Sequence, residues 1–143
     1  MISLQQVAPQ DIEAESFRII ERELGPTAFA PDEFAVVRRI IHATGDFSYA
    51  ETLRLHPEAV AAGLAAIRCR RNLLVDVGMA AAGVSAHLLA AFGGRVLCRV
   101  AEPETATLAR ANGTTRSDAA MTRATGDNIG IIAIGNAPTA LLK

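Results

Sequence analysis

The amino-acid sequence predicts an α/β fold in which helices cover both faces of a largely parallel sheet. Three short runs, residues 73–77, 95–100 and 129–134, are rich in Val, Leu and Ile, as buried strands are. Helical segments separate these runs, and strands that alternate with helices pair in parallel. A chain of 143 residues can bury roughly two thirds of the surface that it exposes when unfolded. We therefore expect one domain over residues 1–143, with three layers, α/β/α, around a parallel or mixed sheet.

Composition argues against several classes of protein. Lys and Arg number 14 and Asp and Glu 15, so the formal charge is −1 and lacks the basic excess of a nucleic-acid-binding protein. The chain has no Trp and one Tyr, too few aromatic side chains for a base-stacking platform. Cys69 and Cys98 have no neighbours at ligand spacing. We expect reduced, partly buried thiols and no metal site.

An uncharged stretch, residues 77–94, has one feature of a membrane helix. Its four glycines, together with Ser85 and His87, are unusual in such a helix, and a buried turn followed by a helix fits better. Residues 1–6 lack the basic segment and the apolar stretch of a secretory signal. The sequence therefore predicts a cytoplasmic protein without a membrane partner.

A first helix is predicted over residues 9–24. It ends at Gly25–Pro26, because Gly terminates helices and Pro cannot continue one. A serine on a helix commonly bonds to its own backbone, so Ser16 alone has no functional weight. Helical spacing places the inner face of this helix at four positions: Ile12, Ser16 or Phe17, Ile20 and Leu24.

A second helix is predicted between Pro31 and Gly45. Pro31 suits the first helical position, and Gly45 can adopt the left-handed conformation that closes a helix. His42 then lies in the last turn, where the helix dipole favours a protonated imidazole. Such a histidine can exchange a proton near neutral pH, although one in a last turn is more often a capping or packed residue. The apolar side of this helix is predicted at Phe34, Val37, Ile41 and Ala43.

The remaining helices lie between the predicted strands or before them. One opens at Pro57, and another runs from Pro103 to Asn112–Gly113. The first of these two ends in three arginines that we interpret as a solvated cap: Arg68, Arg70 and Arg71.

Polar groups that could bind a ligand follow the predicted strands, and ligands of parallel sheets bind at the carboxyl ends of the strands. Asp76 comes near the end of the first strand. Gly135 and Asn136 follow the third strand and enter a helix, where backbone N–H groups are exposed. The alternative for this loop is an ordinary strand–helix turn.

A second candidate loop precedes a predicted helix start at residues 112–118. Thr115, Arg116 and Ser117 combine two hydroxyls with a guanidinium, and together with helix N–H groups they could hold a carboxylate or a phosphate. The alternative is a helix cap. His56 and His87 have no ligand-spaced partners and are predicted to be structural or exposed. The sequence has no Walker motif, no G-x-G-x-x-G and no G-x-S-x-G, so neither a nucleotide site nor a hydrolase is supported.

Four segments taken together resemble the precorrin-8X methylmutase family of cobalamin biosynthesis, and their order and spacing agree across nearly the whole chain. The most specific is Ala-Ile-Gly-Asn-Ala-Pro-Thr-Ala-Leu at residues 133–141. Asp76 and Met79 resemble an intervening Asp-x-x-Met segment of the family. The other three segments are the Ser16-Phe17 pair of the first helix, Ile40-Ile41-His42-Ala43-Thr44-Gly45, and Gly113-Thr114-Thr115-Arg116-Ser117.

The resemblance implies a mixed α/β/α fold, a homodimer and a tetrapyrrole site between subunits. Family enzymes move a methyl group from carbon 11 to carbon 12 of precorrin-8X to give hydrogenobyrinate, and relatives act likewise on cobalt-precorrin-8 to give cobyrinate. No separate cofactor is used. His42 would be the acid/base residue. Substrate-binding residues would be Ser16, Thr115, Arg116, Ser117, Gly135 and Asn136.

Family members continue beyond the residue 133–141 motif with the rest of a helix and a further segment, so we expect the present chain, which ends at Lys143, to be C-terminally short. Two hypotheses follow from the resemblance. The chain is an isomerase, or it is a non-catalytic tetrapyrrole carrier or an incomplete subunit completed by another chain. A third hypothesis, an unrelated anion-binding α/β domain, is disfavoured by the residue 133–141 motif.

Overall fold

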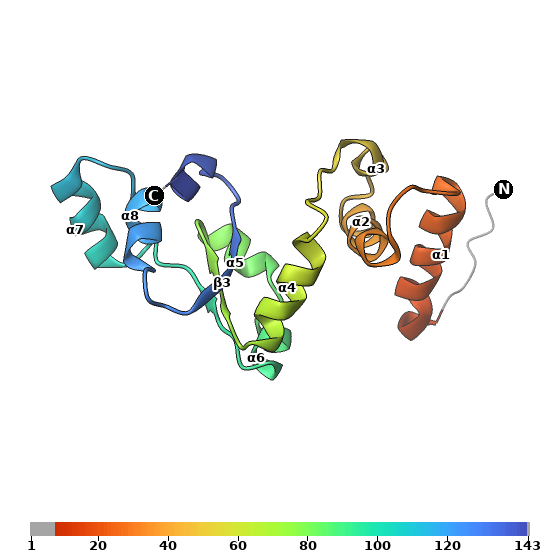
Figure 1. Cartoon of the computed structure of the whole chain (residues 1–143), viewed down its shortest axis with the longest axis horizontal. Helices are drawn as coiled ribbons and strands as arrows, with labels where there is room; N and C mark the ends of the chain where they lie inside the picture. The colour runs from red at the N-terminus through yellow and green to blue at the C-terminus, as the bar shows by residue number, and fades with distance from the viewer. Residues whose placement is uncertain (1–7, 143) are drawn as a thin grey trace. The chain divides into compact units, whose positions relative to one another are not determined.

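In the computed structural model, which describes residues 8–142, the chain separates into a helical unit, Met1–Val60, and an α/β unit, Ala61–Lys143 (Figure 1). The expectation of one domain over residues 1–143 stays a prediction. None of the helices in the described part of the chain is both long enough and apolar enough to span a bilayer.

The helical unit begins with two helices that end where the sequence predicts. A short 3₁₀ turn, Pro9–Asp11, leads into α1, Ile12–Leu24, and α2 covers Pro31–Thr44. Gly25 has φ 64° and Gly45 has φ 69°, both in the left-handed region where Gly carries no Cβ penalty. The Gly45 N–H donates to the carbonyl of Ile41 at 2.8 Å and closes α2. A further short helix, α3, covers Tyr49–Thr52.

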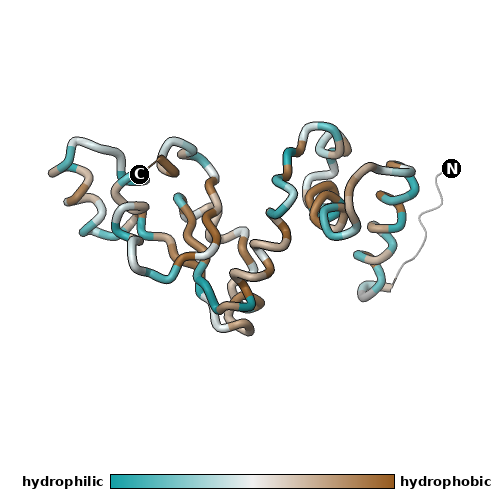
Figure 2. The backbone as a smooth tube through the Cα atoms, in the orientation of Figure 1, coloured by the Kyte–Doolittle hydropathy of each residue, from teal (hydrophilic) through white to brown (hydrophobic). Residues whose placement is uncertain are grey.

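Packing of α1 against α2 makes the core of the helical unit. Val37 and Ile41 lie one turn apart on α2 and are buried together with Ile20 of α1. Figure 2 shows the apolar residues of α2 alongside its hydrophilic ones. Ile12 was predicted on the inner face but is 55% exposed, because the covered part of α1 begins one turn later, at Phe17. Half-buried residues complete this core: Phe17, Leu24, Phe29, Tyr49, Ala50, Leu53 and Leu55.

The α/β unit contains a three-stranded parallel sheet, which confirms the predicted fold class. The strands are β1, Asn72–Val75, β2, Val96–Leu97, and β3, Ile129–Ala133, in the order β2-β1-β3. The second strand is shorter than the residue 95–100 run that was predicted. Beyond Leu97 the chain turns toward the next helix, because the carbonyl of Arg99 accepts a hydrogen bond from the buried Thr105 hydroxyl at 2.7 Å.

Helices lie before and between the strands. The helix before β1 is α4, Ala59–Arg68; β1 and β2 are joined by α5, Gly78–Gly83, and α6, Ala86–Ala91. Residues 77–94 were predicted to form a buried turn and helix. Instead the two helices are short, and most of the segment is exposed, because only Leu89 and Gly94 are buried in it. Exposed large side chains of this segment are Met79, Leu88 and Phe92.

The second connection runs from β2 to β3 through α7, Pro103–Asn112, and α8, Arg116–Arg123. After β3 the described chain ends in a 3₁₀ helix, Pro138–Leu142, where the sequence predicted the start of an α-helix. The side chain of Arg123 ties α8 to α7, since it donates to Glu102 at 2.5 Å and to Thr105 at 2.6 Å. That hydrogen bond from Arg123 holds the pKa of Glu102 below its ordinary value. These contacts fix α8, whose N-terminus carries one candidate loop.

Strand side chains alternate between the two faces of the sheet. Leu73 and Ile131 line a cavity with Leu88 of α6, whereas Leu74 and Ile132 face α8 and the final 3₁₀ helix. Helices therefore cover both faces, as the sequence predicts.

The two cysteines are free thiols. Cys98 is half-buried as expected, but Cys69 is exposed, because it follows α4 at the surface turn that precedes β1.

A register shift between Asn72 and Leu73 makes Gly130 the extra residue of a bulge in β3. A Cβ at Gly130 would collide with the Cβ of Arg71, so we expect Gly130→Ala to destabilise the protein by about 1–3 kcal/mol in urea unfolding followed by circular dichroism. Gly63→Ala is the control. It lies inside α4 with open space around its Cβ, and should be stabilising by about 0.5–1 kcal/mol. Equal unfolding midpoints for the two variants would contradict this account.

Candidate functional site

The last turn of α2 brings His42 to Ser16 of α1. The Ser16 Oγ and His42 Nδ1 atoms are 2.9 Å apart, a hydrogen bond between two half-buried side chains. Ser16 does not bond to its own helix, which was the ordinary expectation for a helical serine. His42 Nε2 makes no hydrogen bond to any described residue, so this nitrogen is the one open to a ligand.

A phenyl ring lies beside this pair. The Phe17 and His42 ring centroids are 5.3 Å apart with an interplanar angle of 77°, an edge-to-face contact. The guanidinium carbons of Arg38 and Arg39 lie 4.3 Å and 4.9 Å from the Phe17 centroid, within cation–π range. Sequence reasoning missed these two arginines. Their positions three and four residues before His42 were the available signal, because such residues share one side of a helix.

In the α/β unit, Asp76 is fully buried directly after β1. Its Oδ1 accepts the backbone N–H of Gly135 at 2.7 Å, and its Oδ2 accepts those of Asn136 and Ala137 at 2.9 Å and 2.8 Å. Burial by itself would raise the pKa of Asp76, but these N–H donors outweigh it and lower the pKa below its ordinary value. An ionised carboxylate therefore holds the loop after β3.

These contacts correct one expectation about Gly135 and Asn136. Their backbone N–H groups were predicted to be open to a ligand, but both donate to Asp76. The reason is the parallel pairing of β1 with β3, which brings the ends of the two strands together. A Cβ at Gly135 would lie 3.1 Å from Val77 Cγ2, so this residue also sits in a tight contact. The side chain of Asn136 is exposed and is the group of this loop that remains open.

The loop before α8 forms a helix cap, which was the alternative interpretation of this segment. The Thr115 hydroxyl accepts the backbone N–H of Asp118 at 3.1 Å, and the Thr114 hydroxyl donates to the Asp118 carboxylate at 2.6 Å. Thr115 and Arg116 are exposed and Ser117 is half-buried. Their ligand-binding role stays a prediction.

The predicted site residues thus fall into two groups. Ser16 and His42 contact each other in the helical unit, whereas the residue 115–117 and 135–136 loops belong to the α/β unit. His56 and His87 are both exposed, as predicted. Among residues 8–142, no cluster of three or more His, Cys, Asp or Glu side chains could hold a metal ion.

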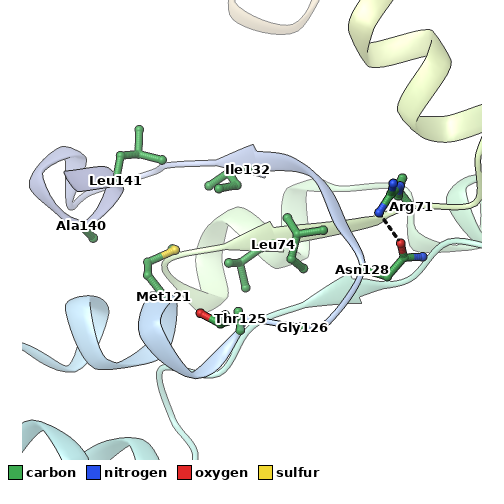
Figure 3. Close-up of a pocket in the computed structure, with 11 residues that line it drawn as sticks. Arg71, Leu74, Met121, Thr125, Gly126, Asn128, Ile132, Ala140 and Leu141 are labelled. Atoms are coloured by element: carbon green, nitrogen blue, oxygen red, sulfur yellow. Dashed lines mark hydrogen bonds between the residues drawn. The ribbon is translucent and has the colours of Figure 1, made fainter. Parts of the chain in front are cut away.

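A cavity of about 580 Å³ lies on one face of the sheet and contains none of the predicted site residues (Figure 3). Leu74, Ile132 and Leu141 give it apolar walls. Near one end, the Arg71 guanidinium donates to the Asn128 side chain at 2.6 Å. The cavity adds no group suited to acid/base chemistry.

Comparison with known proteins finds similarity to precorrin-8X and cobalt-precorrin-8 methylmutases. Residues 11–143 match the sequence profile of the family described as precorrin-8X methylmutase. The cobalt-precorrin-8 methylmutase of Leptospira interrogans is 38% identical over 137 residues, which are 94% of this chain and 62% of that protein. The precorrin-8X methylmutase of Sinorhizobium sp. is 36% identical over 130 residues, 88% of this chain and 60% of that protein.

A solved structure agrees in fold. The precorrin-8X methylmutase of Thermus thermophilus superimposes with a TM-score of 0.80 at 42% identity, covering 92% of this chain and 65% of that one. The chain therefore spans less than two thirds of the length of these relatives.

Asp76→Asn should lower the free energy of unfolding by about 2–4 kcal/mol at pH 7, because an amide offers one oxygen and turns a donor toward the backbone N–H groups. The folded-state pKa of Asp76 is lowered, so its contribution is complete above the ordinary Asp pKa of about 3.9 and is lost as pH falls through the folded value. The difference between wild type and variant should therefore be constant from pH 8 to 5 and narrow below about pH 4.

Urea unfolding across this pH range measures the effect, and amide hydrogen exchange at residues 135–137 locates it. Asp11→Asn, an exposed carboxylate before α1, is the control and should change neither quantity. Unprotected amides at residues 135–137 in the wild type would refute the role of Asp76.

Ser16→Ala should remove the hydrogen bond to His42 Nδ1 and shift the imidazole nitrogen resonances toward those of a free imidazole, with a stability loss of about 1 kcal/mol. Nitrogen-15 NMR of the histidine side chains measures the shift. The exposed His56 and His87 are internal controls. Identical His42 resonances in the variant would mean that the bond is absent in solution.

Proposed function

Because this chain belongs to the precorrin-8X methylmutase family, we propose that it isomerises precorrin-8X or cobalt-precorrin-8. The methyl group would leave carbon 11 of the macrocycle and bond to carbon 12, giving hydrogenobyrinate or cobyrinate. No atoms are gained or lost, so the reaction calls for a proton donor and acceptor and a site that fixes geometry, without a separate cofactor.

The observation that supports this proposal most directly is the 2.9 Å contact between Ser16 and His42. A hydroxyl bound to Nδ1 holds the imidazole in one orientation and leaves Nε2 for the macrocycle. In the proposed mechanism, Nε2 delivers a proton that makes the ring system electron-poor and favours the 1,5-shift of the methyl group. The same nitrogen takes the proton back when the product forms. General acid–base assistance of this kind is typically worth about 10²–10⁴ in rate.

The substrate carries many carboxylates, which suits the polar groups of the α/β unit. We propose that Thr115, Arg116 and Ser117 bind substrate carboxylates, since all three stand at the N-terminus of α8 with Arg116 exposed. For the loop after β3, the contact is proposed through the exposed Asn136 side chain, with Gly135 allowing the loop to pack closely against Val77. The tetrapyrrole site is proposed to form between the subunits of a homodimer.

A second function, tetrapyrrole binding without isomerisation, is kept because the chain spans about 62% of the length of a curated relative. In that case His42 would contribute nothing to affinity, and another chain could supply the rest of the site. The two functions differ in turnover and not in binding.

The test is a spectral assay of purified chain with precorrin-8X. Wild type should convert it to hydrogenobyrinate, and His42→Ala should lower kcat by about 10²–10⁴ while still binding the substrate. His87→Ala replaces an exposed histidine of α6 and should retain full activity.

Each outcome separates the two functions. Conversion by wild type and by His87→Ala, but not by His42→Ala, supports the isomerase. A bound spectrum that never changes, with equal affinity in all three proteins, would overturn the isomerase and support the carrier.

A further inference from the structure

Beyond the acid/base pair, we propose that Arg39 binds a carboxylate of the ligand next to His42, and that Glu13 occupies this position until the ligand displaces it. The inference rests on the proposed function only in naming the ligand as an anionic tetrapyrrole. It adds a binding residue in the helical unit, separate from the loops at residues 115–117 and 135–136.

The geometry places a cation close to the reacting imidazole. The Arg39 guanidinium carbon is 4.9 Å from the Phe17 ring centroid, and the His42 ring is 5.3 Å from the same centroid. The two side chains therefore share the Phe17 ring as a neighbour. A guanidinium stacked on a ring loses less side-chain freedom when it binds a ligand, because the ring has already fixed its position. Its N–H groups lie in the guanidinium plane and can receive a carboxylate through two parallel hydrogen bonds.

The partner that holds Arg39 in the free protein is easily exchanged. Arg39 forms an ion pair with Glu13, and the two side chains are 59% and 51% exposed. Exposed ion pairs contribute little to stability because water screens both charges. A ligand carboxylate can therefore replace the Glu13 carboxylate at small cost.

The neighbouring Arg38 shows by contrast why Arg39 is the binding residue. Arg38 is 27% exposed, pairs with Glu21, and its Nε is buried without an acceptor among the described residues. Its guanidinium carbon lies 4.3 Å from the Phe17 centroid, so it packs the ring in place. The Arg38 side chain takes part in the contact between α1 and α2, whereas the Arg39 guanidinium is exposed to solvent.

The experiment measures the affinity of the full chain for hydrogenobyrinate, the stable polycarboxylate product, and for its fully amidated, uncharged form. Arg39→Gln should weaken hydrogenobyrinate binding about tenfold and leave binding of the amidated form unchanged. Arg22→Gln is the matched control. It removes an equally charged and exposed side chain of α1 that pairs with Glu23, and should leave both affinities at the wild-type level.

A second pair of variants tests the displacement of Glu13. Glu13→Gln removes the internal competitor and should tighten hydrogenobyrinate binding about threefold to fivefold. Glu15→Gln removes the same charge from the same first turn of α1 but pairs with Arg18, and should have no such effect. Thermal unfolding of both variants checks that the helix is equally preserved.

The outcomes distinguish this proposal from the proposed function. Equal affinities for Arg39→Gln and Arg22→Gln, or equal effects of Glu13→Gln and Glu15→Gln, would overturn the carboxylate site even if wild type converts precorrin-8X. If the four variants show the expected affinities but the wild-type chain does not convert precorrin-8X, the carboxylate site is supported and the isomerase is rejected.

Discussion

One buried carboxylate holds the α/β unit together at the ends of its strands. Asp76 follows the central strand β1 and accepts three backbone N–H groups from the loop that follows β3. A charge in such a place is tolerated only when hydrogen bonds replace its lost water, and here backbone donors do so. Because these three N–H groups donate to Asp76, they are not free to bind a ligand.

The helical unit depends on a different contact, the packing of α1 on α2. Ile20, Val37 and Ile41 form its core, and this packing brings two consecutive residues of α1 to the last turns of α2. Ser16 bonds His42, while Phe17 contacts the imidazole and both arginines before it. The Ser16 hydroxyl, the His42 imidazole and the two guanidinium groups are thus brought together by only two helices.

Elements whose ends are set by local chemistry agree with prediction. Gly25, Gly45 and Gly113 end α1, α2 and α7 with positive φ, and these ends could be read from glycines after apolar periodic segments. Elements whose ends depend on distant residues do not agree. The second strand ends at Leu97 because the Thr105 hydroxyl donates a hydrogen bond to the Arg99 carbonyl. The residues next to Leu97 give no indication of this hydrogen bond, so the end of the strand could not be predicted from them.

The sequence by itself determined the family, the parallel α/β class, the position of His42 in a last helical turn and the presence of a helix start near residue 116. These follow from local spacing, turn residues and short motifs. Only the tertiary structure decided that Ser16 faces His42, that Arg39 stands over Phe17, and that Asp76 uses the backbone donors of the loop after β3. Such contacts join residues that lie between 22 and 61 positions apart in the sequence. Local sequence allows many other partners for each of these side chains, and the packing of the helices and the pairing of the strands decide which contacts form.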